Sequence, residues 1–461
     1  MKKALLLAGA CLLAAGSASA ATAFYPPVPE IMGDAISVSS NGRWAVVSDT
    51  EMSYGYLWDA ENPTEYTRVE SGLYDKVNIY GVSDDGMMVG QVYLGDGKWR
   101  PAIRQGLVGD WELLDVDPYT LNSAEATCVS SDGKYIAGWL MIKGDEEADG
   151  PLKGAYYPAQ WTRNDKGGYD YKAFYDFDTL GQQGFITYCQ SNDGRVIGGM
   201  IHAGCSDAFL PAIIIDGKFK MFDEVVYKNE PWYYKDQIMG YDDVSYINGF
   251  KDDQSNNTFV GMFQGVDYDG NLYGCRTIAK DVDEEGNGTL ENYACIYNYE
   301  KDEWQYTDKV RAFSIGHKAD VIYCNNARMI TGGIDGEISS IKETLDFGQD
   351  FSQQLTGILS ISEDNKTLGG CYQVLNPASG EYQYFPFMLV VDGGFNSVEI
   401  VNDGNAPVAI VVSNGNIEFV GAEGVVYDLN GRLVGQGANV NVAAGTYVAK
   451  VGNESRTVIV K

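Results

Sequence analysis

The stretch CVSSDGKYIAGWL, residues 128–140, decides the fold, because its pattern returns along most of the chain. Its polar centre, Ser130 to Gly133, separates two apolar runs. Asp-Gly favours a tight turn, since glycine adopts positive φ without steric cost and aspartate bonds its own backbone. We therefore predict a β-hairpin here, with Gly138 inside its second strand.

The same unit of apolar strand, turn and apolar strand occurs seven times. The copies are VSSNGRWAVV (38–47), VSDDGMMVGQ (82–91), VSSDGKYIAG (129–138), QSNDGRVIGG (190–199), KDDQSNNTFVGM (251–262), CNNARMITGG (324–333) and ISEDNKTLGG (361–370). The turn positions are Gly42, Gly86, Gly133 and Gly194, followed by Asn256, Ala327 and Asn365. A glycine inside the second strand indicates a close approach of two strands, and we expect this at Gly90, Gly138, Gly198, Gly332 and Gly369.

A second element follows many of these units at a variable distance. It begins with an aromatic residue or proline, as in WRPAIRQG (99–106), YYPAQWTRND (156–165), FLPAIIIDGK (209–218) and YFPFMLVVDGG (384–394). We expect Pro101, Pro158, Pro211 and Pro386 at strand starts, where a missing N–H costs little. Each repeat then holds three strands with room for a fourth, which is typical of a β-propeller blade.

The repeats therefore predict an all-β protein with a propeller of about seven blades over residues 21–395, six or eight being the alternatives. Irregular spacing favours a propeller over a β-solenoid, because blades tolerate long loops whereas solenoid coils stack in close register. The longest insertions are expected at about residues 220–250 and 264–310. The composition agrees, with 45% hydrophobic residues, 55 glycines and 32 tyrosines.

The N-terminus has the features of a secretory signal peptide. Lys2 and Lys3 precede an apolar run from Ala4 to Ala15, and Ala18-Ser19-Ala20 supplies a cleavage site. We predict cleavage after Ala20, with lipidation of Cys11 as the less favoured alternative. No later segment approaches the ~20 apolar residues of a membrane-spanning helix, so no transmembrane helix is expected.

Charge and cysteine content narrow the function classes. A protein with a net charge of −31 gains no affinity for nucleic acid by displacing counterions from its phosphates, so nucleic acid is not an expected partner. Seven cysteines follow the signal segment, an odd number with no C-x-x-C pair. Mostly buried thiols are expected, with one or two disulfides as the alternative in an oxidising compartment.

The composition changes after residue 395. Residues 396–461 contain neither Trp nor Cys, and alternating strands are separated by Asn-Gly and Ala-Gly turns. We predict a small Ig-like β-sandwich here. The chain thus divides into a signal peptide (1–20), a propeller (21–395) and a C-terminal β-sandwich (396–461).

Two resemblances extend this prediction. The pairing of S-x-D-G-x-x-x-G with P-A-x-W over residues 30–395 resembles HAF-type repeats of secreted bacterial proteins. The runs VVYDLNGRLV (425–434), AAGTYVAKV (443–451) and RTVIVK (456–461) resemble the C-terminal sorting domain of type IX secretion cargo in Bacteroidetes. The matching positions are Gly431, Arg432, Gly445, Tyr447 and Lys461. This resemblance implies export through the periplasm, recognition by the type IX machinery, and a secreted or outer-membrane-surface location.

Sequence signals for catalysis are scarce. Only His202 and His317 are present, and no serine lies in a G-x-S-x-G elbow. We expect no catalytic residues, metal site or cofactor. The acidic loops 281–292 and 266–271 leave Ca²⁺ open, although Asn292 stands where an EF-hand has its bidentate glutamate.

Aromatic residues give the more specific hint of a binding surface. Trp232, Tyr233 and Tyr234 lie in a predicted insertion and could stack on sugar rings or anchor a protein. We therefore predict a non-catalytic binding protein for a glycan or protein ligand. The alternatives are a propeller glycoside hydrolase or lyase, which needs converging carboxyl groups, and a structural or adhesive surface protein.

Overall fold

The computed structural model divides the chain into two compact units. One unit comprises Ala23–Glu343 and Gln349–Val390, and the other contains Val391–Lys461. The structure describes residues 21–24, 35–60, 66–142, 155–175, 184–202, 208–222, 226–227, 230–231, 246–247, 250–251, 259–267, 270–280, 289–307, 309–310, 313–318, 321–324, 327–345, 347, 354–391, 398–402, 407–413, 416–420, 423–428, 431–443, 445–451 and 454–460.

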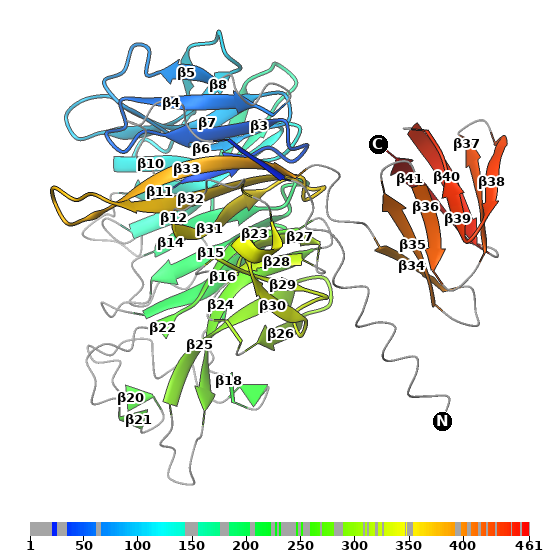
Figure 1. The fold of residues 1–461 in the computed structure, drawn as a ribbon. Helices are drawn as coiled ribbons and strands as arrows, with labels where there is room; N and C mark the ends of the chain where they lie inside the picture. The colour runs from blue at the N-terminus through cyan, green and yellow to red at the C-terminus, as the bar shows by residue number, and fades with distance from the viewer. Residues whose placement is uncertain are drawn as a thin grey trace. The chain divides into compact units, whose positions relative to one another are not determined.

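The described residues before the C-terminal unit contain seven groups of four hydrogen-bonded strands (Figure 1). The first strands are β2 (Ile36–Val38), β6 (Val77–Val82), β10 (Thr120–Val129), β14 (Gly184–Gln190), β23 (Met262–Val266), β27 (Phe313–Lys318) and β31 (Gln354–Ile361). The second strands are β3 (Trp44–Ser48), β7 (Met87–Tyr93), β11 (Tyr135–Ile142), β15 (Val196–His202), β24 (Asn271–Lys280), β28 (Val321–Cys324) and β32 (Thr367–Leu375).

Two further strands complete each group. The third strands are β4 (Tyr54–Asp59), β8 (Trp99–Gln105), β12 (Ala155–Arg163), β16 (Ala208–Ile215), β25 (Thr289–Asn298), β29 (Arg328–Thr331) and β33 (Tyr382–Val391). The fourth are β5 (Tyr66–Glu70), β9 (Trp111–Leu113), β13 (Tyr169–Ala173), β17 (Lys218–Met221), β26 (Glu303–Thr307), β30 (Glu337–Ser340) and, in the last group, β1 (Ala21–Phe24).

The first strands form a closed ring. Along the chain, β2 contacts β6, β6 contacts β10, β10 contacts β14, β14 contacts β23, β23 contacts β27 and β27 contacts β31. The ring closes because β31 also contacts β2. Sheets whose first strands surround one axis are the arrangement of a β-propeller, so the predicted propeller fold is confirmed at that level.

The hydrophobic core is distributed between neighbouring sheets. One cluster joins Val46 and Leu57 of the first group to Ile79 and Met88 of the second. Further clusters join the fifth group to the fourth and to the sixth, and Met388 of the last group to the first. A further cluster joins the second, third and fourth groups. The first five groups therefore bury apolar residues against both neighbours, which explains their nearly continuous apolar second strands.

A few elements stand outside this scheme. A single parallel pair, Tyr156 with Gly184, joins the third group to the fourth. The remaining elements before the C-terminal unit are β18 (Val226–Tyr227), β19 (Glu230–Pro231), β20 (Tyr246–Ile247), β21 (Phe250–Lys251), β22 (Phe259–Val260) and the helix α2 (Ile341–Thr344). Among the described residues there is no helix with the length and hydrophobicity needed to cross a bilayer.

The turn of the opening stretch is held by its own side chains. Ser130 Oγ donates to Asp132 Oδ1 (2.7 Å) and accepts from Tyr135 N (2.9 Å), while Lys134 N donates to Asp132 Oδ1 (3.0 Å). Gly133 has a φ of 68°. Closely similar bonds occur in the turns that begin at Ser39, Ser83, Ser191 and Ser362. Asp132 is therefore a turn residue, as predicted.

Neighbouring turns are also bonded to one another. The bonds run from Asn41 N to Asp84 Oδ1 (2.7 Å), from Asp84 N to Ser131 O (2.9 Å), from Ser131 N to Asn192 Oδ1 (2.8 Å) and from Glu363 N to Ser40 O (2.8 Å). These bonds join the last group to the first, the first to the second, the second to the third and the third to the fourth. The repeated turn thus joins sheets as well as strands.

The glycines inside the second strands face a bulge in the first strand. A Cβ at Gly138 would lie 1.8 Å from Glu125 O, and one at Gly90 would lie 2.0 Å from Asn78 O. Gly198 and Gly369 are crowded by neighbouring side chains instead. The prediction for Gly332 is wrong: it has a φ of 87° and only one atom, 3.9 Å away, near its Cβ position, so it is a turn glycine.

The fifth and sixth repeats were placed incorrectly by the sequence pattern. The fifth turn lies at Gly270, with a φ of 78°, and Asn256 lies outside the described residues. Residues 264–310 are therefore largely the fifth group itself and not an insertion. In the sixth group Ala327, with a φ of 54°, lies between the second and third strands. The repeat motif is degenerate at these two turns, since neither retains Ser-x-Asp-Gly.

The four prolines lie inside their strands and not at the starts. Pro101 is the third residue of β8, and its carbonyl accepts from Leu114 N (2.9 Å) just after β9 ends. Pro158 and Pro211 accept in the same way from Phe174 and Phe222. Because N–H and C=O of one strand residue point to the same side, the missing N–H faces the edge where the fourth strand ends.

The C-terminal unit contains two four-stranded antiparallel sheets. One consists of β34 (Val398–Asn402), β35 (Pro407–Ser413), β36 (Asn416–Val420) and β39 (Asn439–Asn441); the other consists of β38 (Leu433–Gly437), β37 (Gly424–Asp428), β40 (Gly445–Val451) and β41 (Glu454–Val460). Ile417 and Phe419 of the first sheet share a buried cluster with Val426 and Ala449 of the second. Two sheets with a common core form a β-sandwich.

Candidate functional site

A cavity of about 250 Å³ lies inside the ring of first strands. Six of these strands line it with the residue that stands two positions before the first turn residue. These residues are Ser37, Gly81, Cys128, Cys189, Gly265 and Ser360. All six are small, and the space exists because no large side chain projects at this level of the ring.

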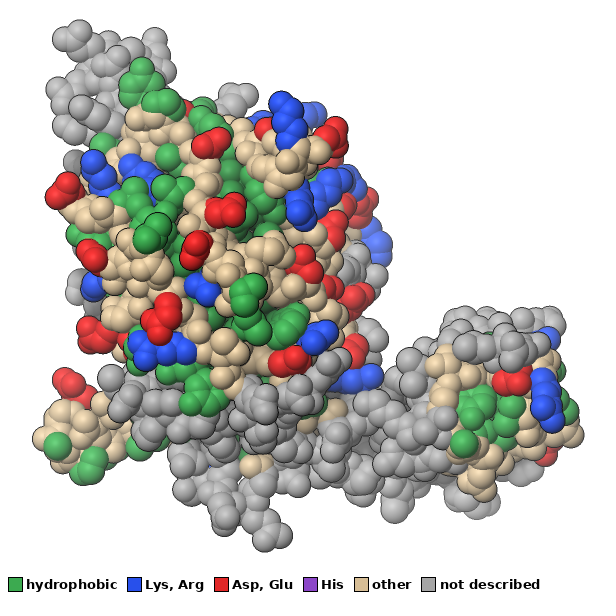
Figure 2. All heavy atoms as spheres, turned by 90° about the horizontal axis from the view of Figure 1, so that it is seen from above, with side chains coloured by type: hydrophobic (Ala, Val, Ile, Leu, Met, Phe, Trp, Pro, Cys, Tyr) green, Lys and Arg blue, Asp and Glu red, His purple; other side chains and the backbone are tan. Residues whose placement is uncertain are grey.

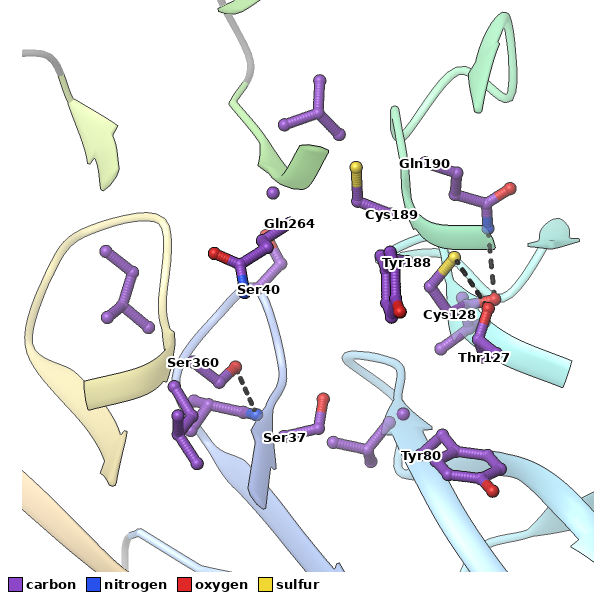
Figure 3. Close-up of a pocket in the computed structure, with 18 of the residues that line it drawn as sticks. Ser37, Ser40, Tyr80, Thr127, Cys128, Tyr188, Cys189, Gln190, Gln264 and Ser360 are labelled. Atoms are coloured by element: carbon purple, nitrogen blue, oxygen red, sulfur yellow. Dashed lines mark hydrogen bonds between the residues drawn. The ribbon is translucent and has the colours of Figure 1, made fainter. Parts of the chain in front are cut away.

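The preceding position supplies larger side chains. These are Ile36, Tyr80, Thr127, Tyr188, Gln264 and Leu359. They place two phenol rings, an amide and a hydroxyl at the wall of the cavity (Figure 3). Among the lining residues, all of which belong to the described chain, none is Lys or Arg.

Several polar groups of the wall already have partners. Ser360 Oγ accepts from Val38 N (2.9 Å), and Thr127 Oγ1 donates to Ala137 O (3.2 Å). The carboxylate of Asp267 accepts from Asn271 and from the Tyr273 hydroxyl (2.7 Å). These groups shape the cavity more than they offer contacts to a ligand.

Tyr188 and Gln264 are the wall residues best placed to meet a ligand. Tyr188 remains 39% exposed although it lies on a first strand, and its hydroxyl meets Met200 Sδ at 3.8 Å, a weak contact. Gln264 is exposed as well. Figure 3 shows both side chains at the open space of the pocket. The Oε1 atom of Gln190, also in the wall, is buried without a hydrogen-bond partner.

A carboxyl group, that of Glu125, is hydrogen-bonded to the wall residue Tyr80 but is not itself among the lining residues. Glu125 lies on β10, two residues before the wall residue Thr127, and a bulge of β10 lies between Ala126 and Cys128. Burial raises the pKa of Glu125 to about 7, although hydrogen bonds with Tyr80, Gln91 and Trp139 oppose the shift. A partly buried acid that titrates near neutrality is a common sign of a functional site.

Tyr80 connects this acid to the cavity wall. Its hydroxyl accepts from Asn78 Nδ2 (2.8 Å) and Gln91 Nε2 (2.8 Å), and it is hydrogen-bonded to Glu125. Burial, followed by the charge of Glu125, raises the pKa of Tyr80 well above its ordinary range. The phenol is therefore protonated at neutral pH and donates to Glu125.

The two thiols of the ring are inert groups in this environment. Burial raises the pKa of Cys128 to about 12, and it also raises that of Cys189. Both are free thiols, as are Cys295 and Cys324. This agrees with the expected buried thiols; Cys205 lies outside the described residues.

The predicted aromatic site cannot be located. Trp232, Tyr233 and Tyr234 lie outside the described residues, as does the loop 281–288. His202 ends β15 and His317 lies in β27, so the structure does not bring them together on one strand. In the described part of the chain, no three His, Cys, Asp or Glu side chains gather as metal ligands would. Of the acidic loop 266–271, Asp267 and Gly270 belong to the fifth turn, and residues 268–269 lie outside the described residues.

Most residues of the predicted sorting motif have structural positions. Gly431, with a φ of 78°, and Arg432 form the hairpin turn between β37 and β38, where Arg432 N donates to Asp428 Oδ1 (2.8 Å). Gly445 begins β40, and the hydroxyl of Tyr447 donates to Ala443 O (2.9 Å). Lys461 lies outside the described residues.

The sequence analysis missed the residues that line the cavity, although the sequence contains a signal for some of them. Alignment of the repeats on their turn serines shows small residues two positions upstream in every copy that the motif found correctly. The partners of Glu125 carry no such signal, because they come from three different strands.

The surface charge is mixed. On the face shown in Figure 2, acidic and basic side chains of the described residues are interspersed. Ion pairs such as Arg195 with Asp216 (2.9 Å) and Lys220 with Asp302 (2.7 Å) join exposed groups. Such pairs are worth little individually, so the charge mainly solvates the surface.

Comparison with known proteins adds solved structures only. No protein-family model matches the chain, and no curated protein matches it. Similar solved structures include polysaccharide lyase Uly1 (12% identity, 80% of this chain, 92% of that chain, TM-score 0.43) and oligogalacturonate lyase from Vibrio parahaemolyticus (10%, 79%, 92%, 0.43). Hydrazine synthase of Kuenenia stuttgartiensis is another (11%, 77%, 96%, 0.41). Likeness at this level says nothing of activity, and the fold assignment rests on the ring of strands.

Proposed function

We propose that this protein is a binding protein whose propeller holds a ligand in the cavity at its centre. The observation that carries the proposal is the cavity of about 250 Å³, with Tyr188 and Gln264 exposed in its wall. Ligand pockets usually measure ~300–1,000 Å³. A smaller cavity suits one end of a larger molecule, with the rest of that molecule outside.

The chemistry of the wall favours the end of a glycan. A phenol ring offers a flat face to the C–H groups of a sugar, and the amide and hydroxyl groups match its hydroxyl groups. A ligand with carboxylate, sulfate or phosphate groups would find no Lys or Arg among the lining residues. The net charge of −31 would also repel it.

A propeller hydrolase remains the second candidate. Glycoside hydrolysis ordinarily uses two carboxyl groups ~5–10 Å apart. Glu125 is not among the residues that line the cavity. Asp267 is among them, but both of its carboxylate oxygens are engaged by Asn271 and Tyr273. The arrangement of the described residues thus favours binding.

We also propose that the seven groups are seven blades of one propeller and that the protein is exported. The signal-like segment ends at Ala20, and cleavage there would leave β1 intact because this strand begins at Ala21. The motif around Gly431 and Tyr447 supports a C-terminal, Ig-like sorting domain of the type IX system. A secreted or outer-membrane-surface location follows from these two proposals.

A glycan array with the full mature chain tests the binding proposal. We expect retention of at least one uncharged glycan, and a loss of affinity of at least ~10-fold in Tyr188→Ala, because removal of a stacked ring costs on the order of 1–3 kcal/mol. Tyr382→Ala is the matched control, since Tyr382 is a 52% exposed tyrosine on β33. Equal binding by the two variants would place the site elsewhere, and silence on every glycan would refute a glycan ligand.

A further inference from the structure

A β-bulge in the first strand supplies the exposed side chains of the cavity wall. The residue without a counterpart in the neighbouring strand is Tyr188 in β14, Gln264 in β23 and Leu359 in β31. All three line the cavity and are exposed. Bulges re-aim a side chain and are frequent next to functional sites. A ligand at this level of the ring therefore meets a phenol, an amide and an isobutyl group.

The order of the strands in the ring places Leu359 across the cavity from Tyr188. Between β14 and β31 the ring passes through β23 and β27 on one side, and through β10, β6 and β2 on the other. Two strands in this relation are as far apart as a ring of seven strands allows. Figure 3 shows Tyr188 and Ser360, the neighbour of Leu359 in the chain, on opposite sides of the open space.

The wall changes from apolar to polar around the ring. At the level of Leu359, the last and the first groups supply aliphatic side chains, those of Leu359 and Ile36. The second to fifth groups supply side chains with a hydroxyl or an amide group, namely Tyr80, Thr127, Tyr188 and Gln264. Ile36 is only 6% exposed and packs against Gly369 of β32, whereas Leu359 is 39% exposed. Among the described side chains of this level, Leu359 thus provides the apolar surface that a ligand meets.

We propose that the sugar held in the cavity carries a methyl group in place of a hydroxymethyl group, and that Leu359 determines this specificity. A 6-deoxyhexose is such a sugar. Its methyl group packs against Leu359, while its ring stacks on Tyr188 and one of its hydroxyl groups bonds to Gln264. This inference rests on the proposed glycan function and names the class of sugar at the end of the ligand.

The physical reason lies in the hydration of the sixth carbon of the sugar. A hexose in the same orientation would place its sixth hydroxyl group against Leu359. A hydroxyl group that loses water without gaining a hydrogen bond is unfavourable, whereas a methyl group gains free energy from burial. An N-acetyl group also ends in a methyl, but its amide would need a donor and an acceptor within the apolar part of the wall.

Calorimetric titration of the full mature chain with matched sugars tests the proposal. The pairs are L-fucose with L-galactose, L-rhamnose with L-mannose, and 6-deoxy-D-glucose with D-glucose; the members of each pair differ by one oxygen atom. We expect the 6-deoxy member of at least one pair to bind on the order of 10-fold more tightly than its partner, because the partner buries an unpaired hydroxyl group. Saturation-transfer NMR should show the strongest transfer to the methyl protons of that sugar.

Leu359→Ala should reduce this preference to ~2-fold or less, because the smaller side chain removes most of the apolar contact and leaves room for water. The matched control is Leu375→Ala at the end of β32, since Leu375 is a 51% exposed leucine of the same sheet and is not among the lining residues. This control should keep the preference. The NMR measurement uses the wild type, so it decides the question even where Leu359→Ala fails to fold.

The outcomes separate the two proposals. If both members of every pair bind equally, the inference is wrong while the glycan function stands. If N-acetyl-D-glucosamine binds more tightly than D-glucose and no 6-deoxy sugar is preferred, a 6-deoxyhexose is wrong as well. If the preference survives in Leu359→Ala, another group recognises the methyl and the role of Leu359 is refuted. If none of these sugars binds, this inference fails, and the glycan array decides separately whether the proposed function fails with it.

Discussion

At the scale of single residues, the most consequential placement is Glu125 on a first strand. Its carboxyl group accepts hydrogen bonds from residues of β6, β7 and β11, and burial raises its pKa. The residue therefore links the pH of the medium to the stability of the propeller. Tyr80 shares the effect, because its phenol donates to the same carboxylate.

This linkage gives a stability prediction. The pKa of Glu125 in the folded state, about 7, lies above the ordinary value of 4.5, so the folded state binds more protons than the unfolded state between these pH values. The free energy of unfolding should therefore fall as pH rises from about 5 to 8, and Glu125→Gln should reduce that fall by on the order of 1–3 kcal/mol. Denaturant unfolding followed by Trp fluorescence measures it.

Trp fluorescence is suitable because residues 396–461 contain no Trp, and the signal comes from the propeller. Glu112→Gln, exposed on β9, should follow the wild-type pH profile. If Glu125→Gln and the wild type have the same pH profile of stability, folding does not raise the pKa of this carboxyl group.

At the scale of elements, the hairpin of the first two strands is the unit that the chain repeats. Its turn is held by hydrogen bonds of the Ser and Asp side chains and by the positive φ of the glycine. In its second strand, a glycine lies opposite a bulge of the first strand. Gly138 is such a glycine, because the backbone carbonyl oxygen of Glu125 in the neighbouring strand leaves no room for a Cβ atom there.

Gly138→Ala should therefore destabilise the propeller strongly. Its Cβ would lie 1.8 Å from Glu125 O, which forces the backbone of β10 to move and should cost about 2 kcal/mol or more. Gly168→Ala is the control, because the nearest atoms to its Cβ position lie at 3.8 Å. Thermal unfolding should show a clear loss for the first variant and a change within ~0.5 kcal/mol for the second. Equal losses would mean that the bulge yields freely.

At the scale of the whole propeller, the ring closes at a seam between the last group and the first, and β1, which precedes the first group in the chain, completes the last group beside β33. There the last group meets the first through non-covalent contacts. Val38 N donates to Ser360 Oγ (2.9 Å), and the buried hydroxyl of Thr367 donates to Gly42 O (2.7 Å). Opening at this seam breaks these contacts and separates β2 from the sheet that holds β1, the strand that precedes it in the chain.

Thr367→Val should therefore promote opening at the seam. Loss of the buried bond leaves Gly42 O without its donor and should cost about 1–3 kcal/mol. Hydrogen exchange should rise first in β2, β3, β31 and β32. Thr187→Val is the control, because Thr187 Oγ1 donates to Gly138 O (2.8 Å) between the third and fourth groups, away from the seam. Faster exchange spread evenly over all strands in the Thr367 variant would contradict a weak seam.

The sequence by itself determined the repeated hairpin and the positive-φ turn positions Gly42, Gly86, Gly133, Gly194 and Asn365. These features depend on neighbouring residues, because turn chemistry and strand alternation act over a few positions. The same short range explains the errors at the fifth and sixth repeats, where Asp267 and Ala327 stand outside the Ser-x-Asp-Gly pattern. Asp267 supports the fifth turn through Asn271, which no local motif marked.

Only the tertiary structure decided the channel. The small residues of its wall come from six strands spread over more than three hundred positions, and the partners of Glu125 come from three strands. Closure of the ring places Ser37 beside a cavity shared with Ser360. Burial and hydrogen bonding then set the pKa of Glu125, and both depend on which side chains the closed ring brings together.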